Sequence, residues 1–159
     1  MRLSIPLTLG HGGRTLSMDG LLDTGAEHFI VITDRMASKL GLTRGQATAC
    51  YGVGDNIVCG WQTTIDRVSI AGQPQCTLDK VSAFIIPEIT PGTDILIGEY
   101  FLRSVKAKID LSEEGKPVLV CREGPHIPIS SETVGREVAF AFFGAGAMMI
   151  LLTLLIGEK

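Results

Sequence analysis

The sequence is poor in charge, and no part of it is strongly basic. Charged residues make up 19% of the 159 residues, and 14 Lys and Arg stand against 17 Asp and Glu, which leaves a formal net charge of −3 at pH 7. Lys and Arg form no run anywhere in the chain. Because binding to a phosphate backbone requires clustered cations, these numbers argue against nucleic acid as a partner.

The chain also lacks the residue spacing of a metal or cofactor site. Its 4 cysteines include no CxxC pair, and its 3 histidines stand far apart in the sequence. We therefore expect neither a metal ion nor a cofactor. Because we also expect the main domain to face a reducing compartment, the expected state of Cys50, Cys59, Cys76 and Cys121 is four reduced thiols.

A secretory signal is missing as well, because the apolar stretch Leu3–Leu9 is short, contains Pro6 and has no small-residue cleavage site. The opposite end of the chain is strongly apolar and carries no charge from Val138 to Gly157. A helix of about 20 residues spans roughly 30 Å, the thickness of the bilayer core. A buried core helix is the alternative, but so small a domain can hardly surround a helix that is apolar on every face.

The sequence thus predicts a single-pass transmembrane helix that contacts membrane lipid at residues 138–157. Only Glu158 and Lys159 follow this segment, so we expect insertion after synthesis, with the N-terminal domain left in the cytoplasm. Arg122 and Arg136 before the span agree with that orientation.

The chain before the span is rich in short β-like runs separated by Gly and Pro, which predicts a mainly β domain at residues 1–121. Residues 122–137 are polar and contain two prolines, as a linker between domain and membrane would. The expected strands are Arg2–Leu9, Thr15–Leu22, His28–Ile32, Thr48–Val53, Ile57–Ile70, Cys76–Ile86, Val105–Asp110 and Pro117–Cys121.

Turn and helix signals divide these strands. The Gly-rich segment Gly10–Gly13 predicts a hairpin between the first two strands. One short helix is expected to begin at Thr33 or Asp34 and to stop at Gly41, and another is expected from Glu99 to Arg103.

The residues that carry chemistry are Asp23-Thr24-Gly25-Ala26, which stand between two apolar runs. A turn between two buried strands would place the Asp23 carboxylate, which takes up or releases a proton, beside the Thr24 hydroxyl, which locks the turn by hydrogen bonding. Gly25 leaves room for the close approach of a backbone or a substrate. A simple Asx turn without chemistry is the alternative interpretation.

Two further segments complete a pattern. Asp94-Ile95-Leu96-Ile97-Gly98 leads into a short helical segment, and Tyr51-Gly52-Val53-Gly54-Asp55 forms a glycine-bearing turn between β-like segments. In order along the chain, these segments and DTGA resemble a retropepsin, the single-domain aspartic protease of retroviruses, retroelements and some cellular proteins. The resemblance covers about Leu3 to Val120. It implies a mainly β fold, a retropepsin-like closed β-barrel that forms half of an acid protease and has one or two short helices. The transmembrane helix expected from the apolar run lies outside the shared pattern.

The resemblance also implies roles for individual residues. Asp23 matches the catalytic aspartate, and Thr24 and Gly25 match the residues that brace it. Leu96-Ile97-Gly98 matches the segment behind the active-site loop, and residues 52–55 match the tip of the flap that folds over substrate. The residues expected to bind substrate are Ala26, Gly52, Val53, Gly54 and Ile97, with Leu21, Phe29 and Ile57 as further pocket walls.

Core packing is the alternative role for each pocket wall, and the favoured one for Leu21 and Phe29. The sequence departs from the family's pattern at Glu27, which adds an acid near the loop, and at Asp55-Asn56, which makes the flap tip polar.

Peptide hydrolysis by carboxylates needs both a base to activate water and an acid to protonate the leaving nitrogen, and one aspartate cannot be both at once. The sequence holds a single D-T-G and no D-S-G, so the second carboxylate must come from another chain. We expect a membrane-anchored homodimeric aspartic endopeptidase that hydrolyses peptide or protein substrates with a water activated between two Asp23 carboxylates.

Two alternatives to this function remain at the level of sequence. One is a catalytically inactive retropepsin-like module that binds peptide or dimerises at the membrane. The other is a small structural membrane protein in which DTG occurs by chance.

A last expectation concerns the flap. If Gly54-Asp55 is a two-residue hairpin turn, Cys50 lies directly opposite Cys59. Their Cβ atoms would then be about 4.5 to 5.5 Å apart, close enough for a cross-strand disulfide that forms under oxidation and stiffens the flap. The expected reducing compartment favours free thiols instead.

Overall fold

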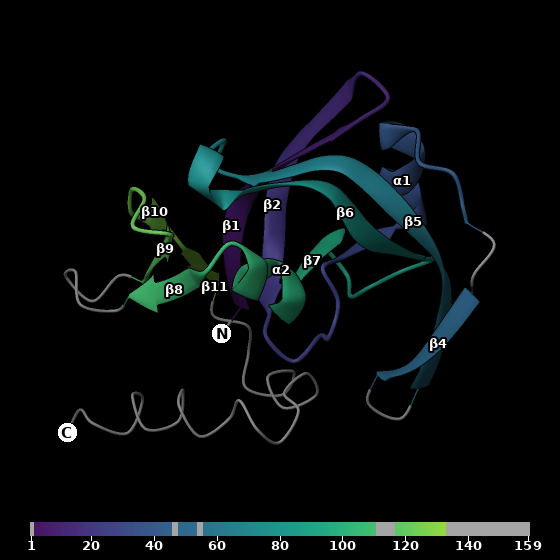
Figure 1. Cartoon of the computed structure of the whole chain (residues 1–159). Coiled ribbons are helices and arrows are strands. Elements are labelled where there is room, and N and C mark those ends of the chain that lie inside the picture. The colour runs from purple at the N-terminus through teal and green to yellow at the C-terminus, as the bar shows by residue number, and fades with distance from the viewer. Residues whose placement is uncertain (1, 46–47, 54–55, 111–116, 133–159) are drawn as a thin grey trace, which may run out of the picture.

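The computed structural model describes residues 2–45, 48–53, 56–110 and 117–132. Its strands are β1 (Arg2–His11), β2 (Arg14–Asp23), β3 (Ile30–Thr33), β4 (Thr48–Val53), β5 (Asn56–Ile70), β6 (Thr77–Ile86), β7 (Ile95–Gly98), β8 (Ala107–Asp110), β9 (Val118–Cys121), β10 (Ile127–Pro128) and β11 (Ser130–Glu132), as Figure 1 shows. Helices α1 (Asp34–Leu40) and α2 (Glu99–Ser104) and a 3₁₀ turn (Pro74–Cys76) complete the elements. The mainly β prediction is confirmed.

Six of the strands close into a barrel in the order β1-β2-β7-β3-β6-β5, because β5 also pairs with β1 through Leu7 and Ile70. β11 extends the sheet beyond β1, and β4 extends it beyond β5. A separate three-stranded sheet has the order β10-β9-β8. β11 and β4 therefore lie outside the closed ring of strands, and β4 forms an arm with part of β5 (Figure 1).

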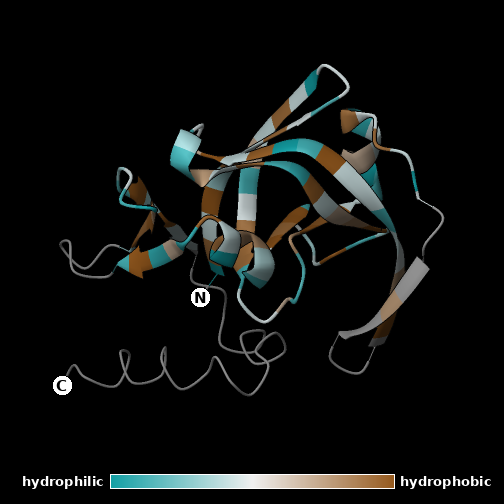
Figure 2. Cartoon of the chain, in the orientation of Figure 1, coloured by the Kyte–Doolittle hydropathy of each residue, from teal (hydrophilic) through white to brown (hydrophobic). Residues whose placement is uncertain are grey.

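The barrel forms because its long strands alternate between apolar and polar residues. In β1, Ile5, Leu7 and Leu9 are buried, whereas Pro6 between them is exposed. Hydrophobic and hydrophilic segments alternate along the strands in Figure 2. Since successive side chains of a strand point to opposite faces, this alternation directs one apolar face of each strand into a common core.

The end of α1 and the start of α2 agree with the sequence prediction. α1 ends at Gly41, whose φ of 79° is the left-handed conformation that glycine adopts at little cost. The Gly41 and Leu42 amides donate to the Ser38 and Ala37 carbonyls and complete the last turn. α2 begins at Glu99 as expected and ends at Ser104, one residue later than predicted.

Residues 122–137 were expected to be a polar linker, but part of this segment forms strands of the folded domain. β10 pairs with β9, and β11 pairs with the start of β1 through Arg2 and Glu132. These strands belong to the folded domain, so residues 127–132 do not form a tether.

The predicted transmembrane helix at residues 138–157 lies outside the described residues. Within the described part of the chain, no helix combines the length and apolar character needed to cross a bilayer.

The expectation of four reduced thiols is wrong for this structure. Cys50 forms a disulfide with Cys59, and Cys76 forms one with Cys121. Cys50 and Cys59 are directly opposite in the β4–β5 ladder, as the hairpin register predicted.

Candidate active site

Asp23 is the last residue of β2, and the loop of residues 24–29 connects it to β3. β7 lies between these two strands, parallel to β2 and antiparallel to β3. In this register Asp23 is opposite Gly98, and Ile30 is opposite Ile97. The loop therefore crosses over the end of β7, where that strand continues directly into α2.

Backbone hydrogen bonds join this loop to the start of α2. The Gly98 amide donates to the Phe29 carbonyl over 3.0 Å, and the Glu99 amide donates to the Ala26 carbonyl over 2.9 Å. A third bond runs from the Tyr100 amide to the His28 carbonyl over 3.3 Å. The first amides of a helix have no hydrogen-bond partner within the helix. Here these otherwise unpaired amides donate to loop carbonyls and hold the loop in place.

Gly98 is required by the same close packing. A Cβ atom at this position would lie 2.1 Å from the His28 carbonyl oxygen and 2.8 Å from that of Ala26. Both neighbours are backbone atoms, which cannot turn aside as a side chain can. The glycine of the Leu96-Ile97-Gly98 segment thus lets β7 pass directly behind the Asp23 loop, as the resemblance implied.

The Asp23 carboxylate is held by the backbone of its own loop. The Gly25 amide donates to Asp23 Oδ1 over 3.0 Å, and the Ala26 amide donates to the Asp23 carbonyl oxygen over 3.3 Å. Partial burial raises the pKa of Asp23 above its usual value of 3.8, and the Gly25 and Ala26 amides oppose this shift. Thr24 and Gly25 are exposed in the single chain, so the loop presents an open surface next to the partly buried Asp23 carboxyl group.

A row of apolar side chains lies on the same face of the sheet as Asp23. Leu21 precedes Asp23 by two residues and so shares its face of β2. Ladder partners place Leu96 of β7 beside Leu21, Val31 of β3 beside Leu96, and Phe84 of β6 beside Val31. We call Leu21, Leu96, Val31 and Phe84 the apolar row. It belongs to a hydrophobic cluster separate from the main core, and Val58 of β5 packs against that cluster.

Ile97 does not line this face, contrary to its expected role in substrate binding. It alternates with Leu96 along β7, is fully buried in the main core, and its side chain lies where a Cβ of Gly20 would be. The residue that the sequence analysis missed is Leu96. The available signal was the strand period of two, because the neighbour of Gly98 on the Asp23 face is two residues away, at position 96.

The loop also positions two aromatic contacts. The His28 ring stacks on Phe84 at the end of the apolar row, with ring centroids 5.6 Å apart. Burial lowers the pKa of His28, and the nearby Glu27 carboxylate opposes that shift. Phe29, expected as a pocket wall or a core residue, packs partly buried against the main core and makes an edge contact with Tyr100 of α2.

The remaining predicted substrate-binding residues are divided between the loop and the arm. Ala26 is half-buried in the loop, where its carbonyl accepts the Glu99 amide. Gly52 and Val53 lie in β4, opposite Ile57 and Asn56. Ile57 has 78% of its surface exposed. Gly54, with Asp55, lies outside the described residues.

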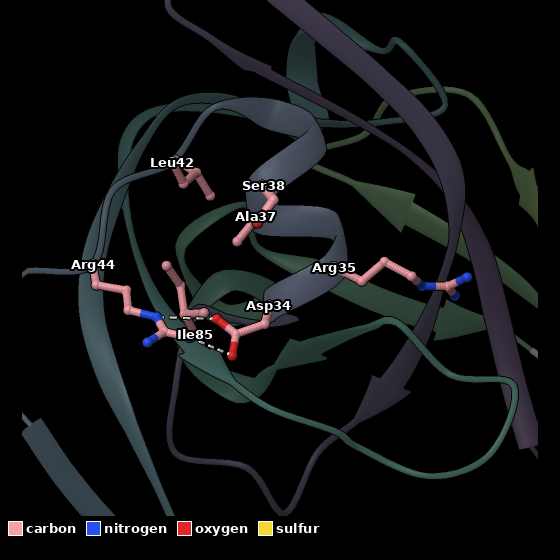
Figure 3. A pocket seen from close by; sticks show the side chains of 7 residues that line it. All are labelled: Asp34, Arg35, Ala37, Ser38, Leu42, Arg44 and Ile85. Carbon is pink, nitrogen blue, oxygen red and sulfur yellow. Dashed lines mark hydrogen bonds and ion pairs between the residues drawn. The ribbon is translucent and has the colours of Figure 1, made fainter.

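A pocket of about 430 Å³ lies elsewhere (Figure 3). Its walls come from α1, the segment after it and β6: Asp34, Arg35, Ala37, Ser38, Leu42, Arg44 and Ile85. Ile85 alternates with Phe84 along β6, so this pocket opens on the other face of that strand from the apolar row. It shares no residue with the Asp23 loop. The part of the chain that the structure describes holds no group of three or more His, Cys, Asp or Glu at metal-binding separation.

Comparisons with known proteins agree with this geometry. The family described as gag-polyprotein putative aspartyl protease matches residues 12–104, which include Asp23, the arm and Gly98. The crystal structure of the retroviral protease-like domain of Ddi1 from Leishmania major is similar in fold, with a TM-score of 0.55 and 19% sequence identity. This similarity covers 83% of this chain and 96% of that one.

No curated protein matches the sequence. The family match extends over more than half of the chain, and the fold agrees with it independently. The chain therefore belongs to the gag-polyprotein putative aspartyl protease family.

Proposed function

We propose that the chain is a homodimeric aspartic endopeptidase, anchored in a membrane by residues 138–157, that hydrolyses peptide bonds with a water activated between two Asp23 carboxylates. The observation that carries the proposal is the placement of Asp23. Its carboxylate is held by the Gly25 amide at the end of β2, has a raised pKa, and shares a sheet face with the apolar row. Membership of an aspartyl protease family supports the same chemistry.

The proposed reaction needs two carboxyl groups in different protonation states. One Asp23 carboxylate removes a proton from water as the water attacks the peptide carbonyl, while the other, protonated Asp23 donates its proton to the carbonyl oxygen. The first Asp23 then passes the proton it took from water to the leaving nitrogen, and the second regains a proton from the hydroxyl of the tetrahedral intermediate as the carbonyl re-forms. Two carboxyl groups about 3 Å apart share one proton because both cannot ionise readily. Burial of Asp23 within each chain acts in the same direction, since it already favours the protonated form.

The second carboxylate is supplied by a second copy, because Asp23 is the single D-T-G aspartate of the chain. In a two-fold dimer the same residue of each copy meets at the axis. The exposed Thr24 and Gly25 would then contact their counterparts. The proposed membrane anchor favours this pairing, because confinement to a plane raises the effective concentration of the copies.

The proposed substrate is an extended peptide that lies between the arm and the apolar row. Main-chain hydrogen bonds to strand edges would supply affinity, and apolar side chains of the peptide would contact Leu21 and Leu96 nearest to Asp23. Val58 of the arm supports this arrangement, because it packs against the cluster that contains the row.

Replacement of Asp23 by Asn tests the proposal. Asn keeps an oxygen that can accept the Gly25 amide, but it can neither take up nor release the proton. We expect the full-length Asp23→Asn protein to lose cleavage of a peptide library by at least about 1000-fold. Asp19→Asn is the matched control, because Asp19 is an exposed carboxylate on the same strand. Its cleavage rate should equal that of the wild type.

Equal cleavage by the wild type and Asp23→Asn would contradict the proposed catalysis. A wild-type chain that binds peptides and dimerises but cleaves none of them would instead identify the inactive binding module. Peptide binding is therefore measured on the same samples as cleavage.

A further inference from the structure

β4 and the first part of β5 form an arm that projects from the barrel (Figure 1). We define the arm as Thr48–Val53 and residues 56–61, which pair from Thr48–Trp61 to Val53–Asn56. β5 also pairs with β6, but that ladder ends at Trp61 and Ile85. Among the described residues, the part of β5 before Trp61 therefore has β4 as its only ladder partner.

The base of the arm is fixed to the barrel. The Gly45 amide donates to the Gln62 carbonyl over 2.9 Å, and a Cβ at Gly45 would lie 2.2 Å from that oxygen. The Arg44 guanidinium stacks on the Trp61 ring, 3.9 Å from its centre. It also donates hydrogen bonds to both carboxylate oxygens of Asp34 (Figure 3). These contacts attach the arm to the barrel at Gly45 and Trp61.

The Cys50–Cys59 disulfide joins the two strands in the distal part of the arm, beyond Trp61. Its cysteines are direct ladder partners with a Cα–Cα distance of 4.0 Å, and both are exposed. The other disulfide differs in its surroundings. Cys76 and Cys121 have 1% and 0% of their surfaces exposed and belong to the main core.

Access decides which disulfide an external thiol attacks, because the thiolate must reach a sulfur atom to form a mixed disulfide. We propose that the Cys50–Cys59 bond is a thiol–disulfide exchange site: a dithiol from solution reduces it in the folded protein, while Cys76–Cys121 stays oxidised. A two-stranded ribbon alone is marginally stable in water, so loss of this cross-link loosens the distal arm.

The chemistry balances with the dithiol as the reductant. One thiolate of the dithiol bonds to Cys50 or Cys59 sulfur and breaks the disulfide, which releases the other cysteine as a thiol. The second thiolate of the dithiol then attacks the mixed disulfide, closes the dithiol into its own disulfide and releases the second cysteine. Two electrons and two protons pass to the protein, and the dithiol is oxidised.

The effect on activity rests on the proposed function, in which the arm covers the substrate. Val58 lies next to Cys59 and packs against the apolar cluster beside Asp23, so a looser arm would hold a peptide less firmly over that row. Reduction should raise KM severalfold and change kcat little, because the Asp23 loop is fixed through α2 and not through the arm.

The experiment uses the full-length protein treated with graded dithiothreitol under native conditions, alkylated with iodoacetamide and mapped by mass spectrometry. We expect alkylation at Cys50 and Cys59, with Cys76 and Cys121 protected until the protein is unfolded. Alkylation of both pairs at the same dithiothreitol concentration, or of neither pair, would overturn the exchange site.

Peptide cleavage is measured on the same samples and on the double variant Cys50→Ser, Cys59→Ser. The variant should show the raised KM of the reduced wild type and should not respond to dithiothreitol. A variant with the KM of the oxidised wild type would overturn the control of substrate binding. Selective alkylation without cleavage in any sample would reject the proposed function but leave the exchange site in place.

Discussion

At the scale of single residues, the candidate site depends on close backbone packing more than on side-chain contacts. Gly98 marks the point where β7 passes behind the Asp23 loop, and the amides that follow it hold that loop by its carbonyls. A side chain at Gly98 would therefore disturb the carboxylate through the backbone that carries it.

Gly98→Ala is expected to destabilise the protein severely, because its Cβ would lie 2.1 Å from the His28 carbonyl oxygen. We expect a loss of about 3 kcal/mol or more in the free energy of unfolding, measured by urea denaturation. Gly10→Ala is the control, since the atoms nearest to its Cβ would be 3.9 Å away. Similar stability of the two variants would contradict the close packing described for Gly98.

Asp23 should also make stability depend on pH. A raised pKa means that the folded chain favours the protonated acid, so stability falls as the pH rises from the ordinary value of 3.8 through the folded pKa. Asp23→Asn cannot ionise and avoids this loss. Its melting temperature should exceed that of the wild type at pH 7 and approach it at pH 3, as followed by circular dichroism in the dissociated protein. A difference in melting temperature that does not change with pH would contradict the burial of Asp23.

The sequence was sufficient to locate Asp23, Gly25 and Gly98, because DTGA and an apolar pair before glycine are short patterns with a direct steric or chemical meaning. It did not locate Leu96 in place of Ile97. Both are large and apolar, and which of them shares the face of Asp23 depends on the pairing of β2 with β7, which joins residues far apart in the chain.

At the scale of elements, the hairpins and helices were predictable because their signals are local. Glycines mark the β1–β2 turn, and Gly41 marks the end of α1. β10 and β11 were missed because residues 122–132 are mostly polar and contain two prolines, and the only apolar alternation, Ile127 and Ile129 around Pro128, is too short to predict a strand. β11 forms through its pairing with β1, at the other end of the described chain, and no local signal contains that information.

The link between α1 and the arm is testable through Arg44. Arg44→Ala removes both the stacking on Trp61 and the ion pair with Asp34, in which the Arg44 and Asp34 side chains are 53% and 31% exposed. At such exposure the loss of stability should be about 1 kcal/mol or less. Hydrogen exchange of the amides in residues 56–61 should become faster.

Arg103→Ala is the control for this measurement, because Arg103 forms an ion pair with Glu99 within α2, away from the arm. It should leave exchange in the arm unchanged. Equal exchange rates in the arm of the wild type and Arg44→Ala would show that the base of the arm is held by other contacts.

At the scale of the whole molecule, one chain supplies half of the proposed active site. The closed barrel, the Asp23 loop and the apolar row are complete within a single chain, but the second carboxylate is not.

Mixing wild-type and Asp23→Asn chains tests most directly whether two copies share one site. The full-length proteins are dissociated, mixed in equal amounts in detergent and allowed to reassociate, and peptide cleavage is measured per total protein. Random pairing leaves about a quarter of the dimers with two Asp23 residues, so a site shared by two chains predicts about a quarter of the wild-type rate. A rate of about one half, which is what independently active chains give, would contradict it.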